Sequence, residues 1–175
     1  MAEHRALVSL KVHSDNGLEL LRQTLRNTFE PGNVLALSSI YKIFGEQHRP
    51  LHVHDLRSLT RYQGLCAVAQ LRVMTPAQKL LIHLMSAEER QAKDSSHHRV
   101  SLNLLTYDDQ VSMNPQLTLP HPELHTQPYY MIPAAEIWAD YRHPILNKSF
   151  HELAQELARQ PWGEFFAQGK SLLDF

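Results

Sequence analysis

The feature of this sequence that most constrains its fold is the order in which strand-like and helix-like segments follow one another. Four segments have the apolar alternation or the composition of strands, at residues 5–12, 34–44, 63–74 and 100–107. Two others repeat their apolar residues at helical spacing: Leu18, Leu21, Leu25 and Phe29 in the first, and Leu80, Leu81, Leu84 and Met85 in the second. The predicted order is therefore β-α-β-β-α-β.

This order predicts an α+β domain with a ferredoxin-like core, in which an antiparallel sheet carries both helices on one face. The chain has 175 residues, which fits a single domain over 1–175 with a core that needs no disulfide or metal staple. Residues 45–60 are polar and irregular and are expected to form a loop.

The remainder of the chain is predicted to be a C-terminal extension. Residues 115–133 contain five prolines, so this segment is expected to be extended or irregular. A third helix follows, because Phe150, Leu153 and Leu157 share one helical face, and it is expected to end near Pro161.

Composition excludes several classes of protein. The formal net charge is −1, which gives no reason to expect a nucleic acid or an anionic membrane as partner. No run of apolar residues is long enough for a transmembrane helix, and the first residues lack the apolar stretch of a signal peptide. The one cysteine, Cys66, rules out an internal disulfide and suits a reducing, cytoplasmic location.

Glycine is scarce and histidine abundant, with 6 and 12 residues. Few glycines argue against a glycine-rich phosphate loop. His52 and His54 could present two imidazoles to one metal, but only Asp55 stands beside them and no cysteine completes a ligand set. These histidines are therefore expected to be incidental, and Cys66 is expected to be a buried strand residue rather than a nucleophile.

Several strings, taken in order, resemble those of one enzyme family. They are Ser38-Ser39-Ile40-Tyr41, the run LCAVAQL at 65–71, Thr75-Pro76 with Lys79-Leu80-Leu81, the string LTLPHP at 117–122, His143-Pro144-Ile145-Leu146, and Lys148-Ser149-Phe150 with Glu152-Leu153. The chain resembles the 6-hydroxymethyl-7,8-dihydropterin pyrophosphokinase family of folate biosynthesis over residues 6 to 158. The resemblance implies pyrophosphate transfer from ATP to a dihydropterin, with two Mg²⁺ ions.

The resemblance also locates the departures of this chain from the family. The family holds its metals with two aspartates at i and i+2, in a pattern R-x-x-D-L-D on the fourth core strand. The apolar register of this chain places Ser101 and Asn103 at those metal positions, and the asparagine that binds the pterin corresponds to Cys66. A Gly-Ser-Asn turn of the family corresponds to 11–13, which has no glycine.

Other positions keep the family's residue type. The resemblance implies nucleotide-binding roles for Glu88 and His121 and a pterin-stacking role for Tyr129. Arg90 and Arg99 are the candidates for the catalytic arginines, since His98 falls at the arginine of the pattern.

Each of these residues also has an ordinary structural interpretation. Ser101 and Asn103 could be ordinary polar residues on a half-exposed strand face. Glu88 could be a solvated residue at the end of a helix, and His121 could cap a turn. Three hypotheses remain: a weak enzyme of this family, a non-catalytic relative that binds ATP, a pterin or a protein, and a structural module or homo-oligomer with an empty pocket.

Overall fold

The computed structural model describes residues 2–43, 63–94 and 98–174. Its elements, in chain order, are β1 (His4–Ser14), α1 (Gly17–Thr28), a 3-10 turn (Pro31–Asn33), β2 (Val34–Leu37), β3 (Ile40–Ile43), β4 (Gln63–Val73), α3 (Ala77–Asp94), β5 (Arg99–Tyr107), β6 (Ser112–Asn114), β7 (Leu117–Leu119), α4 (Pro128–Ile137), α5 (Phe150–Leu157), β8 (Gly163–Ala167) and a last 3-10 turn (Gly169–Leu172).

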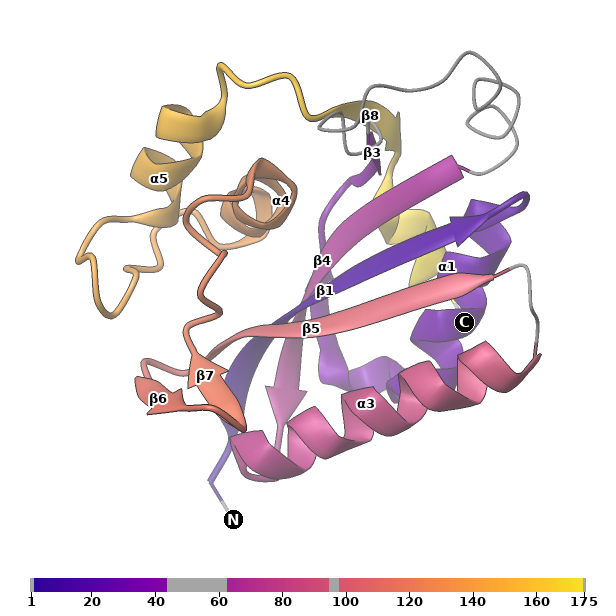
Figure 1. Cartoon of the computed structure of the whole chain (residues 1–175), viewed down its shortest axis with the longest axis horizontal. Coiled ribbons are helices and arrows are strands. Elements are labelled where there is room, and N and C mark those ends of the chain that lie inside the picture. The colour runs from indigo at the N-terminus through magenta and orange to yellow at the C-terminus, as the bar shows by residue number, and fades with distance from the viewer. Residues whose placement is uncertain (1, 44–62, 95–97, 175) are drawn as a thin grey trace.

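The main sheet runs in the order β5-β1-β4-β3-β8, with β2 also paired to β4 (Figure 1). Every pairing in it is antiparallel. Together with α1 and α3, this sheet confirms the ferredoxin-like α+β fold predicted from the order of segments. The strands β6 and β7 form a separate two-stranded sheet.

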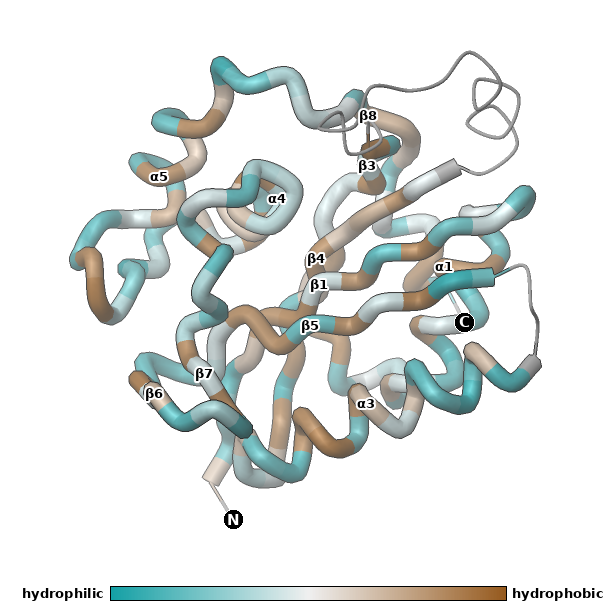
Figure 2. Tube along the Cα trace, viewed as in Figure 1, coloured by the Kyte–Doolittle hydropathy of each residue, from teal (hydrophilic) through white to brown (hydrophobic). Residues whose placement is uncertain are grey.

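One face of the sheet packs against α1 and α3. Alternate residues of β1 point into this core, and Leu102 and Leu104 of β5 do the same. Figure 2 shows this alternation along β1 and β5, where hydrophilic and hydrophobic positions follow one another. The alternation fixes the register of the strands, because a slip of one residue would bring polar side chains into the core.

The opposite face of the sheet is covered in part by α4 and α5. Leu7, Val68 and Leu105 of the sheet pack there with Met131 of α4 and Phe150 of α5. The predicted placement of the core helices on one face is confirmed for α1 and α3. The later helices give this second face its own apolar core, a layer that the prediction did not contain.

The segment 34–44 is not one strand as predicted. The strand breaks after Leu37, and β3 begins at Ile40. Ser38 explains the break, because its hydroxyl accepts the backbone N–H of Val68 at 2.9 Å and donates to the carbonyl of Ser39 at 2.8 Å. A side chain thus takes the place of a backbone partner in the ladder.

The expectation that 115–133 is extended or irregular holds at its first end, where the chain forms a strand, and is wrong at its last end, where it forms a helix. Its first residues belong to the β6–β7 hairpin, and its last six begin α4. Pro128 is the first residue of α4, where the missing N–H of proline has no helical partner to lose. Pro133 lies inside the helix, and the consequence of its missing N–H is described below.

The third predicted helix is confirmed as α5, and Ser149 explains where it begins. Its hydroxyl accepts the backbone N–H of Glu152 at 3.2 Å, and the Glu152 carboxylate accepts the N–H of Ser149 at 2.7 Å. This reciprocal pair is a capping box.

In the described part of the chain, no helix has the length and apolar character needed to cross a bilayer.

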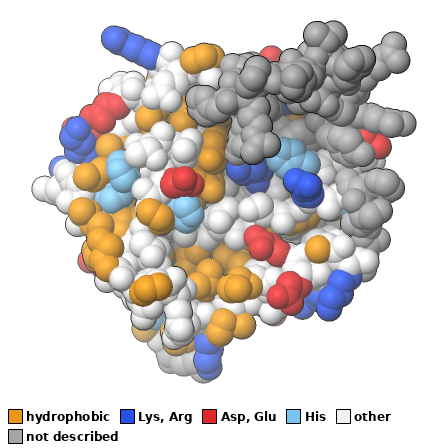
Figure 3. All heavy atoms as spheres, in the orientation of Figure 1, with side chains coloured by type: hydrophobic (Ala, Val, Ile, Leu, Met, Phe, Trp, Pro, Cys, Tyr) orange, Lys and Arg blue, Asp and Glu red, His pale blue; other side chains and the backbone are white. Residues whose placement is uncertain are grey.

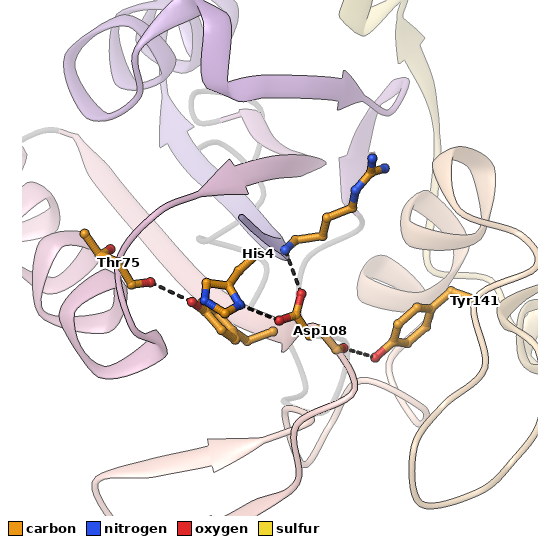
Figure 4. Close-up of polar contacts among 6 residues, drawn as sticks. His4, Thr75, Asp108 and Tyr141 are labelled. Atoms are coloured by element: carbon orange, nitrogen blue, oxygen red, sulfur yellow. Dashed lines mark hydrogen bonds and ion pairs between the residues drawn. The ribbon is translucent and has the colours of Figure 1, made fainter. Parts of the chain in front are cut away.

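A polar cluster holds the start of β1 to the end of β5 (Figure 4). The carboxylate of Asp108 contacts Nδ1 of His4 at 2.6 Å and accepts the backbone N–H of Arg5 at 2.8 Å. Tyr141, in the segment between α4 and α5, donates its hydroxyl to the carbonyl of Asp108. Asp108 adopts a left-handed backbone with φ of 46°, so these contacts hold a residue in a sparsely populated conformation.

Candidate functional site

A row of five side chains crosses the sheet on the face covered by α4. The register pairs Phe165 with Tyr41, Tyr41 with Cys66, Cys66 with Lys11, and Lys11 with Ser101. Directly paired residues of antiparallel strands project to the same face, so these five positions are neighbours. We call Tyr41, Cys66, Lys11, Ser101 and Asn103, together with Tyr129 of α4, the sheet-face site.

Ser101 and Asn103 lie side by side in this site. Asn103 pairs with Ser9 of β1, one step along the sheet from the pair of Lys11 and Ser101. The amide of Asn103 donates to the hydroxyl of Ser101 at 3.2 Å, and both residues are half-buried. The register that places them together, with Leu102 and Leu104 on the core face, is confirmed.

Lys11 supplies the positive charge of the sheet-face site. Its Nζ lies 4.3 Å from the ring centroid of Tyr129 and 6.0 Å from that of Tyr130. An ammonium at this distance is attracted by the ring quadrupole. Among the described residues, no ion pair neutralises Lys11. Figure 3 shows basic and histidine side chains over the strands beside α4.

Cys66 faces α4 from the sheet. Pro133 has no N–H to donate to the carbonyl four residues before it, which is that of Tyr129. The Cys66 thiol, a weak donor, faces this carbonyl at 4.0 Å. Burial raises the pKa of the thiol to about 12, although Lys11 opposes the rise. The thiol is therefore protonated at neutral pH, as expected of a buried strand cysteine and not of a nucleophile.

Glu136, at the end of α4, anchors the helix over β3. Its carboxylate accepts the backbone N–H of Ser39 at 2.8 Å and the hydroxyl of Tyr41 at 2.6 Å. Burial raises the pKa of Tyr41, and the hydrogen bond to Glu136 raises it further. The sequence analysis missed Glu136 because it did not predict α4. The polar residues Ser39 and Tyr41, two apart in one segment, were the available sign that an acceptor lies nearby.

The two predicted nucleotide-binding residues occupy different places. His121 lies beside the sheet-face site, with its ring centroid 5.1 Å from that of Tyr130. Its Nδ1 accepts the N–H of Glu123 at 3.2 Å, and burial lowers the pKa of its imidazole. Glu88 accepts the backbone N–H of Leu102 at the edge of the sheet, and burial raises the pKa of its carboxyl.

The two candidate arginines do not lie together. Arg90 lines a pocket with Asn27 and Thr28 of α1, on the face of the sheet that α1 and α3 cover. Arg99 is exposed and begins β5. It lies two residues before Ser101, so both residues are on the same face of the strand. Only Arg99 is therefore on the side of the sheet-face site.

The donors of the sheet-face site do not suit a divalent metal. A hydroxyl and an amide that bond to each other stand at the two expected metal positions, with an ammonium beside them. Among the described residues, no three His, Cys, Asp or Glu side chains are close enough to hold a metal ion. His52, His54 and Asp55 lie outside the described residues, and Asp108 is held at the far end of β5 by His4 and Arg5.

Two curated relatives match the chain, and no protein-family model does. Over 91 residues it is 28% identical to 2-amino-4-hydroxy-6-hydroxymethyldihydropteridine pyrophosphokinase of Synechocystis, covering 50% of the chain and 47% of the relative. Over 163 residues it is 25% identical to the enzyme of the same name from Haemophilus influenzae, covering 89% of the chain and 91% of the relative. The first of these matches spans about half the length of that relative.

Solved structures share the fold at low sequence identity. A crystal structure of HPPK-DHPS in complex with substrates superposes with a TM-score of 0.63 at 11% identity, covering 87% of this chain and 43% of that one. A triple mutant of Plasmodium falciparum HPPK-DHPS gives a TM-score of 0.64 at 10% identity, covering 89% and 44%. The chain thus spans less than half the length of each of these proteins.

The class of protein is therefore a ferredoxin-like α+β domain with two added helices over one sheet face. Within that class, the chain is similar to the 2-amino-4-hydroxy-6-hydroxymethyldihydropteridine pyrophosphokinases, at 25–28% identity.

Proposed function

We propose that this chain is a relative of the pyrophosphokinases that binds a ligand on the sheet-face site and transfers pyrophosphate weakly or not at all. One observation carries the proposal. Ser101 and Asn103 occupy the positions at which the family resemblance predicts two metal-binding aspartates. The two side chains form a hydrogen bond with each other beside the Lys11 ammonium.

The energetic cost of lacking two metal-binding carboxylates supports weak or absent catalysis. Magnesium favours carboxylate and phosphate oxygens, and phosphoryl transfer depends on positioning and charge neutralisation. One charge pair at 4 Å is worth about 4 kcal/mol at an effective dielectric constant of 20. Since about 1.4 kcal/mol of barrier is a factor of ten in rate, the absence of two carboxylates corresponds to several orders of magnitude.

The ligand-binding part of the proposal rests on the aromatic side chains. Tyr129 and Tyr130 stand edge to face at 4.7 Å, and His121 lies against Tyr130. Tyr130 is buried, so half-buried Tyr129 and His121 are the surfaces available to a flat heterocycle such as a pterin or the base of ATP. Lone Cys66 and near-neutral charge suit a cytoplasmic protein acting without nucleic acid or membrane.

A turnover measurement tests the proposal. The full chain is mixed with ATP, Mg²⁺ and hydroxymethyldihydropterin, and AMP is measured. No AMP above background is expected from the natural chain. The double variant Ser101→Asp with Asn103→Asp is expected to gain Mg²⁺ binding, because it restores two carboxylates on one strand face. Turnover by the natural chain at a rate typical of enzymes would overturn the proposal.

A second candidate function is self-association through β8. This strand is the last of the described sheet, and Phe165 and Phe166 on it are 56% and 38% exposed. An edge strand presents unpaired backbone N–H and C=O groups, which can pair with the same strand of a second copy of the chain. Sedimentation of the natural chain and of Phe166→Glu distinguishes the cases: a dimer that the variant abolishes supports self-association, and a monomer excludes it.

A further inference from the structure

We infer that the sheet-face site binds a phosphate-bearing ligand directly on the Lys11 ammonium, with no divalent cation between them. The inference rests on the proposed function and specifies the ligand chemistry of the same site. It follows from the charge, the hydrogen-bond donors and the aromatic walls around Lys11.

Among the described residues, no ion pair neutralises the charge of Lys11. Its cross-strand neighbours are Ser101, which is uncharged, and Cys66, which is protonated at neutral pH. The carboxylate of Glu136 is already engaged by Ser39 and Tyr41. Arg99, two residues before Ser101 on the same face of β5, adds a second positive charge to this side. Such a site repels a divalent cation and attracts an anion.

The hydrogen-bonding groups beside Lys11 can donate. Because the Ser101 hydroxyl accepts the amide of Asn103, its own proton remains available. If the amide orientation were reversed, the Ser101 proton would go to the carbonyl of Asn103 and leave the Asn103 amide protons available. In either case at least one proton stands next to the ammonium, which is the arrangement that an oxyanion requires.

The ammonium is held in place before any ligand arrives. Lys11 is half-buried, and its Nζ lies over the Tyr129 ring at 4.3 Å. This contact restricts the side chain, so less conformational entropy is lost on binding an anion. The same ring offers a hydrophobic surface to whatever the phosphate is attached to.

Calorimetric titration with inorganic tripolyphosphate tests the inference on the full chain. We expect binding in EDTA, with no Mg²⁺ present, and no stronger binding in MgCl₂, because Mg²⁺ held by tripolyphosphate reduces the negative charge that Lys11 attracts. Lys11→Met should weaken binding about tenfold or more, whereas Lys11→Arg should retain it, because only the methionine variant loses the charge-assisted hydrogen bond. Lys79→Met is the matched control, because Lys79 is an exposed lysine of α3 on the opposite side of the sheet.

A second variant keeps the test decisive if Lys11→Met fails to fold. Ser101→Asp places a carboxylate opposite Lys11 and should also abolish binding in EDTA. The inference is overturned by binding that requires Mg²⁺, by an unchanged affinity in Lys11→Met, by an equal loss in Lys79→Met, or by no binding. AMP production is a separate readout: turnover at a rate typical of enzymes would overturn the proposed function, while an absence of tripolyphosphate binding would overturn only this inference.

Discussion

His143 is predicted to make the stability of this protein fall in mild acid. Its side chain is 3% exposed, and its Nδ1 accepts the backbone N–H groups of Ile145 and Leu146 at 3.3 and 3.2 Å. The ring centroid of His125 lies 5.6 Å away. Burial, and to a lesser extent the nearby His125, lower the pKa of His143 to about 4.

The sign and size of the effect follow from proton linkage. Between pH 6.5 and pH 4 the unfolded chain protonates His143 and the folded chain does not, so the unfolded state binds more protons. The free energy of unfolding is therefore complete above pH 6.5 and decreases as the pH falls toward 4. The loss from this one group is about 3 kcal/mol, since each pKa unit is worth about 1.4 kcal/mol.

Urea unfolding at several pH values between 7 and 4 measures this loss. The matched variant is His143→Asn, whose side-chain carbonyl can still accept the two backbone N–H groups but does not titrate. The natural chain should lose about 3 kcal/mol more than the variant over this range. Parallel pH dependence in the two proteins would refute the reasoning, because the loss would then come from other groups.

Three further predictions concern stability and are each checked by urea unfolding. Gly169→Ala should cost about 1–3 kcal/mol or more, because its Cβ would lie 1.9 Å from the carbonyl oxygen of Ser38; Gly32→Ala, with no atom within 4 Å, should cost far less. Ser149→Ala should cost about 1 kcal/mol through loss of the capping box of α5. Glu136→Gln should cost about 1–2 kcal/mol, because a charged acceptor of several hydrogen bonds is lost, and it should lower the pKa of Tyr41 in a spectroscopic titration.

The core of the fold was predictable because its signals are periodic. The alternation in 100–107 identified which side chains of β5 face the helices, and the spacing of Phe150, Leu153 and Leu157 identified α5. Both depend only on a repeat within one segment. The prediction that Ser101 and Asn103 share a face came from the same reasoning and is confirmed by the burial of their neighbours.

The helix α4, which forms the second layer together with α5, was not predictable by these means. Prolines in 115–133 argued against a helix, yet Pro128 begins α4 where no N–H is needed, and the carbonyl left by Pro133 faces the Cys66 thiol while the helix packs on the sheet. That contact comes from a strand more than sixty residues away. The place of Lys11 in the site depends likewise on pairings between separate strands, which no local pattern records.

The antiparallel register of β1 separates what the chain needs for folding from what it needs for chemistry. Val8, Leu10 and Val12 face α1 and α3 and fix the register, while Lys11 between them belongs to the other face. Substitutions on that second face can exchange carboxylates for a hydroxyl, an amide or an ammonium without moving the strand. A fold shared with proteins 10–11% identical in sequence therefore leaves the residues of this second face free to differ while the strands keep their places.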